Sequence, residues 1–285
     1  MRSRVRHLPP LLLLLFIALP GCATVPRPRP AAPAVATSRP PAHRHAFPDP
    51  AADRPWVAIV IDDMGDSLDQ VRPFLEIPLP LSFAVLPTAA EAGFVARSLS
   101  ELGRDVLAHV PMEPAEPGLP VPPGTLMTSM DAPAIRDAAR LALARVPGAI
   151  GANNHMGSAF TRSYDAMRPF AQVLKSRGLF FLDSRTDPGT IAEEVAVAEG
   201  VPAIRRAVFL DHSDDPADIA GMLQALQAAA RAKGCAIAIG HPRAATIEAL
   251  RRFATDPGRS VDVVPVSRLV GRGCATGAAQ AAPGP

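Results

Sequence analysis

Short apolar runs of about four to six residues recur along most of the chain, separated by stretches of helical length and pattern. The runs lie at residues 57–61, 81–86, 105–108, 148–152, 179–182, within 203–210, at 236–239 and at 261–264. Runs of this kind are typical of strands that are buried on both faces of a sheet. The chain is therefore expected to build a parallel sheet whose faces are both covered.

Five helices are expected between these strands, at residues 90–102, 132–146, 166–177, 218–233 and 244–253. Asp131 is a favourable N-cap for the second helix, and Gly178 and Gly234 are favourable stops for the third and fourth. Strands that alternate with helices imply parallel pairing through right-handed crossovers. We therefore predict an α/β fold with a closed or nearly closed barrel, and an open doubly wound sheet is the alternative.

The N-terminal segment has the pattern of a targeting signal. Arg2, Arg4 and Arg6 precede a short apolar run, which ends at Gly21-Cys22. This pattern predicts export. Residues 1–22 resemble a bacterial lipoprotein signal in which Cys22 is lipidated; ordinary signal cleavage or an uncleaved anchor is the alternative. The expected location is the bacterial periplasm or cell envelope, with membrane attachment through the N-terminal lipid.

A tether is expected after the signal, at residues 23–55. Nine of these 33 residues are proline, with alanine and arginine between them, so the segment has little apolar surface to bury. The folded domain is placed at residues 56–270, and residues 271–285 are expected to be a flexible tail.

The charge balance gives no reason to expect nucleic-acid binding. The whole chain has 29 basic and 27 acidic residues, of which eight arginines and two acidic residues lie in the first 55 positions. The remainder is therefore mildly acidic, whereas nucleic acids attract basic surfaces. The sequence also has neither a glycine-rich dinucleotide motif nor a phosphate-binding loop, so no nucleotide cofactor is expected.

Two cysteines lie outside the signal. Cys235 opens an apolar strand, and Cys274 lies in a tail rich in glycine and alanine. An exported protein can join them in a disulfide, but their spacing does not require one.

Polar residues that suit hydrolytic chemistry follow several of the predicted strands closely. They are, in chain order, Asp62, Asp63, His109, Asn153, Asn154, His155, Asp183, Asp211 and His241. The carboxyl ends of parallel strands open on one face of a barrel, where active sites lie. Taken singly, an aspartate after a strand can be a helix cap and a histidine can be a core residue. As a set, these side chains are expected to converge.

Imidazole and carboxylate groups without thiolates suit zinc or another divalent ion in a catalytic geometry. Beside such an ion, one carboxylate can serve as general base and a histidine as general acid. The adjacent Asp62 and Asp63 point in different directions, so they can divide the tasks of base and metal ligand. This chemistry hydrolyses amides or esters, and the absence of a G-x-S-x-G motif argues against a serine hydrolase.

Six segments resemble, in order, the divergent polysaccharide deacetylase family, distant relatives of the NodB-type carbohydrate esterases that remove N-acetyl groups from glycans. The segments are VIDDMG (60–65), HVPMEP (109–114), GANNHMGS (151–158), FLDSRT (181–186), VFLD (208–211) and IGHP (239–242). They span nearly the whole predicted domain. The resemblance implies a distorted (β/α) barrel of about seven parallel strands, similar to a TIM barrel.

The resemblance also implies roles for the residues that match family motifs. Asp62 corresponds to the general base, Asp63 to a metal ligand and His241 to the general acid. His109 takes the first place of a His-x-x-x-His metal motif, whose second place is occupied by Glu113.

Two departures from the classical motifs leave alternatives open. Because position 113 is glutamate, we predict His155 as the third metal ligand and Glu113 as its rival. Asp183 and Asp211 either orient the ligands from a second layer or cap helices. The classical Arg-x-Pro-x-Gly motif is also absent, and Asn153 and Asn154 stand in its region, where they either bind sugar hydroxyls or fix a turn.

The predicted function is a metal-dependent hydrolase of the cell envelope, with a divalent ion such as zinc, that removes acetyl groups from a polysaccharide. The alternative is a catalytically weak or inactive glycan-binding or envelope-assembly lipoprotein that retains the fold. The missing motifs and the scarcity of aromatic residues favour the alternative. The retained pair Asp62-Asp63 and His241 favour the enzyme.

Overall fold

The computed structural model describes residues 54–272 and 274. The predicted signal at 1–22 with its lipidated Cys22, most of the tether at 23–55 and residues 275–285 of the tail lie outside the described residues. Within the described part, no helix is both long and apolar enough to cross a bilayer.

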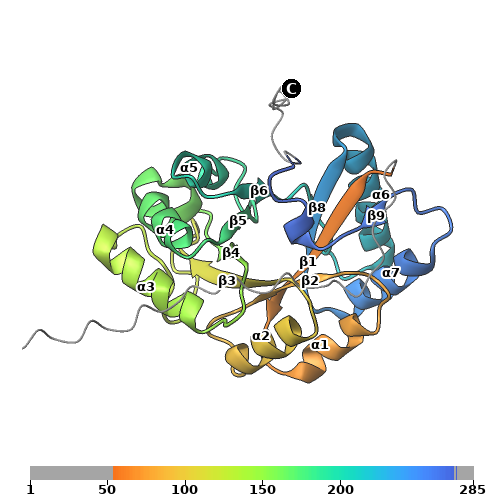
Figure 1. Cartoon of the computed structure of the whole chain (residues 1–285), viewed down its shortest axis with the longest axis horizontal. Coiled ribbons are helices and arrows are strands. Elements are labelled where there is room, and N and C mark those ends of the chain that lie inside the picture. The colour runs from red at the N-terminus through yellow and green to blue at the C-terminus, as the bar shows by residue number, and fades with distance from the viewer. Residues whose placement is uncertain (1–53, 273, 275–285) are drawn as a thin grey trace, which may run out of the picture. The chain divides into compact units, whose positions relative to one another are not determined.

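Every strand of the described residues belongs to one sheet, and every strand pair in it is parallel. The strands are β1 (Trp56–Met64), β2 (Ser82–Val85), β3 (Val106–Met112), β4 (Gly151–Met156), β5 (Phe180–Asp183), β6 (Ala203–Arg205), β7 (Val208–Phe209), β8 (Cys235–Gly240) and β9 (Asp262–Val263). Their order across the sheet is β6-β5-β4-β3-β2-β1-β8-β7, and β9 pairs with the start of β1. The predicted distorted (β/α) barrel is confirmed (Figure 1).

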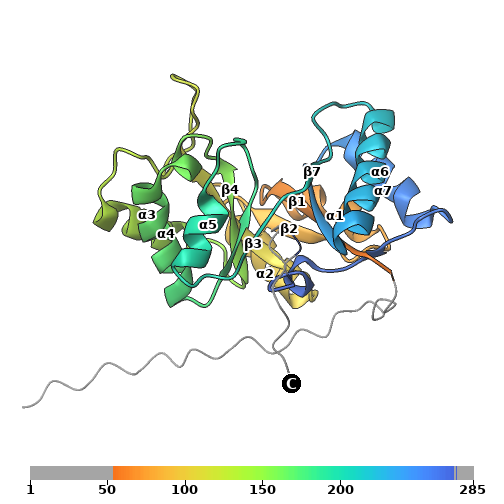
Figure 2. The ribbon, with the colours of Figure 1, turned by 90° about the horizontal axis from the view of Figure 1, so that it is seen from above.

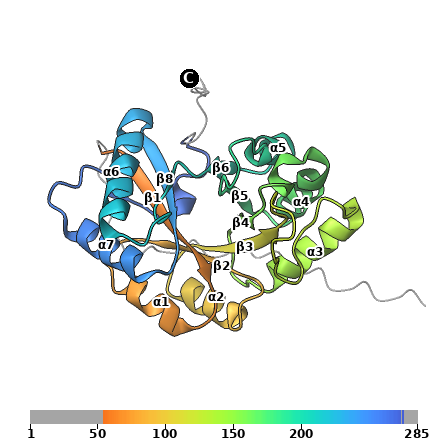
Figure 3. The ribbon, with the colours of Figure 1, turned by 180° about the vertical axis from the view of Figure 1, so that it is seen from behind.

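The helices cover the outer side of the curved sheet, as Figures 1 and 3 show from opposite directions. In the described residues they are α1 (Leu68–Leu75), α2 (Ala92–Glu101), α3 (Ala132–Ala144), α4 (Tyr164–Ser176), α5 (Ala192–Ala198), α6 (Pro216–Lys233) and α7 (Ala244–Thr255), with 3-10 turns η1 (Phe160–Arg162) and η2 (Val266–Arg268). The five predicted helices correspond to α2, α3, α4, α6 and α7.

Two helices were not predicted, and each has a physical reason. Helix α1 contains Pro73, a residue that normally ends a helix, yet the Ser67 hydroxyl caps its first turn by accepting a hydrogen bond from Gln70 N at 3.3 Å. Helix α5 has only seven residues, which is too short for a clear amphipathic pattern.

The single strand predicted within residues 203–210 is in fact two strands at opposite edges of the sheet. β6 pairs with β5, and β7 pairs with β8. Arg206 N still donates to Asp183 O, at the end of β5, whereas Ala207 N donates to Ile237 O on β8. The chain therefore crosses from one edge of the sheet to the other at residues 206–207, where β6 and β7 are joined by the backbone and not by strand pairing (Figure 2).

Alternation along the strands divides the apolar side chains between two cores. In β1, Val57, Ile59 and Ile61 pack into a large core that includes the buried residues of the outer helices. Ala58 and Val60 point the other way, into a smaller core made of inward-facing strand residues and the C-terminal segment. The end of the barrel at which the strands begin is therefore filled with side chains. The remaining inner space lies at the carboxyl ends of the strands.

The C-terminal segment fills the inside of the barrel near the start of the strands. Val266 N donates to Ser82 Oγ at 3.0 Å, and Ser267 N donates to Asp105 Oδ2 at 2.8 Å. A disulfide between Cys235 and Cys274 joins this segment to the first residue of β8 and closes a sequence separation of 39 residues. The pairing that the sequence permitted is thus present in the structure.

Removing the disulfide should destabilise the fold. Replacing Cys235 and Cys274 together by serine is expected to lower the free energy of unfolding by about 2–4 kcal/mol. Without the covalent loop, the unfolded chain has more conformational entropy and is therefore more stable relative to the folded state. Urea unfolding of the full chain measures this loss. A reductant should reproduce it in the wild type and have no further effect on the double variant. A reductant-insensitive wild type would contradict the expectation.

Candidate functional site

A layer of polar side chains lies directly above the smaller core, and strand alternation places it there. Asp62 comes two residues after Val60 of the smaller core, and His109 comes two residues after Leu107 of the same core. In the same way, Ser184, Arg206 and His241 each come two residues after an apolar residue of the smaller core. A side chain two positions further along a strand faces the same side. The inner face therefore changes from apolar to polar at the carboxyl ends of the strands.

Asp63 enters the same layer because β1 contains a bulge. Ile61 pairs with Phe83 and Met64 pairs with Val85, so β1 has one residue more than β2 between these pairs. Met64 is fully buried in the larger core, as Ile61 is, although the two are three residues apart. Asp63 itself has a left-handed backbone with φ of 56°. The bulge therefore lets two consecutive aspartates occupy the site.

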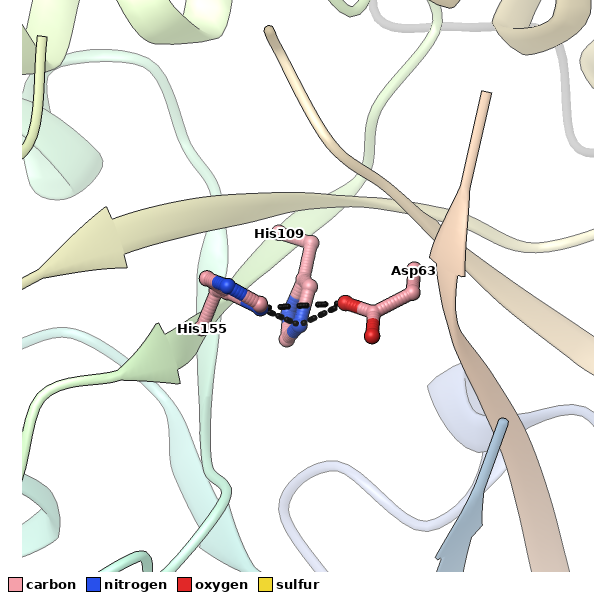
Figure 4. Close-up of side chains that lie close together, drawn as sticks. All are labelled: Asp63, His109 and His155. Atoms are coloured by element: carbon pink, nitrogen blue, oxygen red, sulfur yellow. Dashed lines mark hydrogen bonds and ion pairs between the residues drawn. The ribbon is translucent and has the colours of Figure 1, made fainter. Parts of the chain in front are cut away.

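Asp63, His109 and His155 bring three potential ligand atoms together (Figure 4). Asp63 Oδ1 lies 3.2 Å from His109 Nε2 and 3.0 Å from His155 Nδ1. The two histidine nitrogens lie 3.2 Å apart. The three atoms all fall within 4.8 Å of one another. Asp63 and His155 come from the ends of β1 and β4, whereas His109 lies in the middle of β3, which continues beyond the predicted strand to Met112.

This arrangement fits a divalent metal ion. Asp63 Oδ1 is buried, and no hydrogen bond of ordinary geometry reaches it from the described residues. His109 Nδ1 lies 2.9 Å from Asn153 Oδ1, an acceptor, so Nδ1 carries the proton and Nε2 presents its lone pair to the cluster. A carboxylate oxygen and two imidazole nitrogens are a donor set that zinc accepts.

The pKa values of the cluster reflect its close charges. Burial raises the pKa of Asp63, but contact with His109 and His155 outweighs burial and lowers it overall. Burial lowers the pKa of His109, but Asp62 and Asp63 outweigh burial and raise it. A metal ion therefore competes with a proton for Nε2 of His109.

Asp62 is held beside the cluster by Asn153. Asn153 Nδ2 donates to Asp62 Oδ1 at 2.8 Å, and Asp62 Oδ2 lies 3.5 Å from His109 Nε2. Burial raises the pKa of Asp62, and the nearby His109 and His241 offset this only in part. A carboxylate with a raised pKa accepts a proton more readily than an ordinary aspartate, which suits a general base.

His241 is oriented by Asp211. Its Nδ1 lies 2.8 Å from Asp211 Oδ1, its backbone N donates to Asp211 Oδ2, and Thr246 Oγ1 donates to the same oxygen at 2.7 Å. Burial lowers the pKa of His241, but the bond with Asp211 and the charge of Asp62 outweigh burial and raise it above 6.5. With Nδ1 held by Asp211, Nε2 is the nitrogen left for chemistry.

These groups share one cavity of about 430 Å³. Its walls include Asp62, Asp63, His109, His155 and His241, together with Asn154, Met156, Ser184, Arg185, Thr186, Arg206, Phe209 and Ile239. The three non-glycine residues with positive φ in the described residues, Asp63, Met156 and Arg185, all line it. Unfavourable backbone of this kind clusters at functional sites.

Of the remaining predicted residues, Asn154 lines this cavity, whereas Glu113 and Asp183 are not part of its wall. Glu113 Oε2 accepts hydrogen bonds from Thr128 N at 2.6 Å and Thr128 Oγ1 at 2.5 Å, so its carboxylate faces the loop after β3. Asn154 fixes the turn after β4, because its Nδ2 donates to Met156 O at 2.7 Å. Asp183 Oδ2 accepts from Thr190 Oγ1 at 2.9 Å.

Sequence reasoning assigned no role to the two arginines or to Phe209 in the cavity wall. Arg206 lies within the segment that the sequence predicts as a single strand. Its position two residues after Ile204, an inward-facing residue of the smaller core, is the signal that it also faces inward. Arg185 follows Asp183 and Ser184 after β5, where its charge is unexpected next to a buried strand.

Comparisons with known proteins agree with this architecture. A family model described as divergent polysaccharide deacetylase matches residues 59–270. An uncharacterised protein of Haemophilus influenzae is 37% identical over 213 residues, which cover 75% of this chain and 76% of the relative. The uncharacterised protein YibQ of Escherichia coli is 37% identical over 214 residues, covering 75% and 67%. A solved structure of an uncharacterised protein from Agrobacterium tumefaciens has a TM-score of 0.73 and 26% identity, covering 78% of this chain and 92% of that one.

The Asp211–His241 pair should make stability depend on pH. Burial raises the pKa of Asp211, but the hydrogen bonds from His241 and Thr246 outweigh burial, so folding lowers it below 3.8. This stabilisation is present above 3.8 and is lost as pH falls through the folded pKa. Folding raises the pKa of His241, so its stabilisation is complete below 6.5 and is lost as pH rises through the folded pKa.

Asp211→Asn is therefore expected to lower the free energy of unfolding by about 2 kcal/mol near pH ~5.5, and by less near pH ~9. Urea unfolding at the two pH values checks this. Asp214→Asn is the matched control, since Asp214 is 80% exposed and pairs only at the surface with Arg243. An equal loss at both pH values in Asp211→Asn would argue against the charged pair.

Proposed function

Because this chain belongs to the divergent polysaccharide deacetylase family, we propose that it is a metal-dependent hydrolase that removes acetyl groups from a polysaccharide of the cell envelope. The observation that carries the proposal is the convergence of Asp63, His109 and His155, with Asp62 and His241 in the wall of the same cavity. A merely structural role for these residues would not require their side chains to meet.

Three atoms would hold the metal: Asp63 Oδ1, His109 Nε2 and His155 Nδ1. We take zinc as the ion because the set combines imidazole and carboxylate without thiolate. When bound, such an ion polarises a carbonyl group and makes water more acidic. Asn153 supports this arrangement from behind, because it contacts both His109 and Asp62.

The chain's own residues would move the protons. Asp62, with its raised pKa, takes a proton from the water that attacks the acetyl carbonyl carbon. His241, whose pKa is raised by Asp211 and Asp62, gives a proton to the departing sugar nitrogen or oxygen as its bond to the carbonyl carbon breaks. The products are acetate and a sugar with a free amine or hydroxyl. Asp211 orients His241 throughout.

We also propose that the protein is exported and held at the membrane through lipidated Cys22. The Cys235–Cys274 disulfide supports export, since such bonds persist in oxidising compartments. Substrate and enzyme would then share the cell envelope.

The second candidate function is glycan binding without turnover. One observation favours it: the Glu113 carboxylate stands in the second place of the metal motif but is bonded to Thr128. Against it, His155 lies close enough to Asp63 and His109 to take that place. Metal content and acetate release together separate the two functions.

The metal ligands can be tested by elemental analysis. The full chain, purified without chelator and reloaded with zinc, is expected to hold about one ion per chain. His109→Ala and His155→Ala should each lose it, because either change leaves two ligands. His212→Ala is the matched control, since His212 is exposed and outside the cluster. No stoichiometric metal in the wild type would contradict the proposed centre.

The proton-transfer roles can be tested by acetate release from N- and O-acetylated oligosaccharides. Asp62→Asn and His241→Ala should each lower kcat by a factor of about 10² to 10⁴, because each removes one proton-transfer group. Both should keep the metal. Asp66→Asn, a change at an exposed aspartate in the following turn, should leave kcat unchanged. Metal retained in a wild type that releases no acetate would favour glycan binding instead.

A further inference from the structure

Two arginines in the cavity wall form no ion pair with a carboxylate of the described residues. Arg185 and Arg206 line the cavity beside Asp62, Asp63 and His241. Within residues 54–272 and 274, the ion pairs between arginines and carboxylates all involve other arginines. The two guanidinium groups are close enough that Arg185, after burial, lowers the pKa of Arg206. Asp183 and Asp62 raise the pKa of Arg206, each by less than Arg185 lowers it, and the overall pKa is lowered. Adjacent positive charges that no carboxylate contacts directly are unfavourable in a partly buried site.

Arg206 is held rigidly in position. Its Nε donates to Ser184 O at 2.6 Å, and its Nη2 donates to Arg185 O at 2.7 Å. Its guanidinium lies over the ring of Phe209, 5.1 Å from the ring centre. A guanidinium has five N–H donors, so these two bonds leave three for another partner. The backbone contacts thus fix the group without neutralising its charge.

Arg185 is positioned at a cost. Its backbone is left-handed, with φ of 49°, and its N donates to Asp183 Oδ1 at 2.8 Å. Its Nε is buried, yet no hydrogen-bond partner for this atom exists among the described residues. A buried donor without an acceptor is unfavourable unless a ligand supplies the acceptor. The unfavourable backbone and the missing acceptor both occur at the residue that faces the cavity.

We propose that Arg185 and Arg206 form an anion-binding subsite, so that the glycan bound in this cavity carries a carboxylate or phosphate group on a sugar next to the acetylated position. Guanidinium groups bind such planar or multi-oxygen anions through paired hydrogen bonds. The inference deepens the proposed function and rests on it for the statement that the bound molecule is a glycan. It limits the substrate to acidic glycans.

Binding of small sugars to the full chain tests the subsite without relying on turnover. Glucuronate, glucose 6-phosphate, inorganic phosphate and glucose are titrated by calorimetry into the zinc-loaded protein and into His155→Ala. The two acidic sugars should bind, should bind more tightly than inorganic phosphate, and should still bind to His155→Ala. The stronger of the two acidic sugars identifies the anion. Glucose should show no measurable affinity.

The variants assign the effect to the arginines. Arg185→Gln and Arg206→Gln should each weaken binding of the acidic sugar by about tenfold, which is the loss of one charged hydrogen-bonding group. Arg177→Gln, a change at an exposed arginine at the end of α4, is the matched control and should bind like the wild type. Because Arg206 also braces the segment after β5, Arg185→Gln decides the test if Arg206→Gln fails to fold.

Several outcomes would overturn the inference: equal binding of glucose and glucuronate, wild-type binding in Arg185→Gln, inorganic phosphate binding as tightly as the sugars, or loss of binding in His155→Ala. The last would make the anion a metal ligand. Acetate release from neutral glycans alone, with no effect of Arg185→Gln, would also overturn it and leave the proposed hydrolase standing. Arginine-dependent binding of acidic sugars without any acetate release would support the subsite and count against the hydrolase.

Discussion

Strand β1 runs through the middle of the sheet, pairs with β2 and β8 along its sides, and has one more residue than β2 between its last two pairs. This extra residue interrupts a strict alternation that would otherwise turn Asp63 toward the helices. Asp62 and Asp63 can then take different tasks, one beside Asn153 and the other beside the two histidines. The helix-side packing resumes at once, because Met64 is buried in the larger core.

The rest of the site follows from where the smaller core stops. The C-terminal segment and the inward-facing strand residues fill one end of the barrel, so water and ligands have room only at the carboxyl ends of the strands. The pairing of β3 with β4 sets His109 opposite Asn153 and places His155 two residues further along. Each strand needs only a polar residue after its last inward apolar one to contribute to the cavity.

Much of this could be predicted from the sequence, because apolar runs and strand-end polar residues are local patterns. The barrel, most of its helices and the group of Asp63, His109 and His155 follow from them together with the family motifs. Three features could not be predicted for physical reasons. Residues 203–210 look like one strand because a crossing between sheet edges has no composition of its own. Pro73 disguises α1. Alternation after Ile204 indicates that Arg206 faces inward, but its contact with the segment of Arg185 depends on hydrogen bonds to backbone carbonyls, which no side-chain pattern encodes.

The left-handed backbones of Asp63, Met156 and Arg185 have a consequence for how this protein evolves. Each conformation costs about 1 kcal/mol or more for a residue with a side chain, and glycine at any of the three positions would remove that cost. Selection for stability alone would therefore drive these positions toward glycine. This chain carries aspartate, methionine and arginine there instead, so the cavity keeps its side chains at a cost in stability that the surrounding cores have to supply.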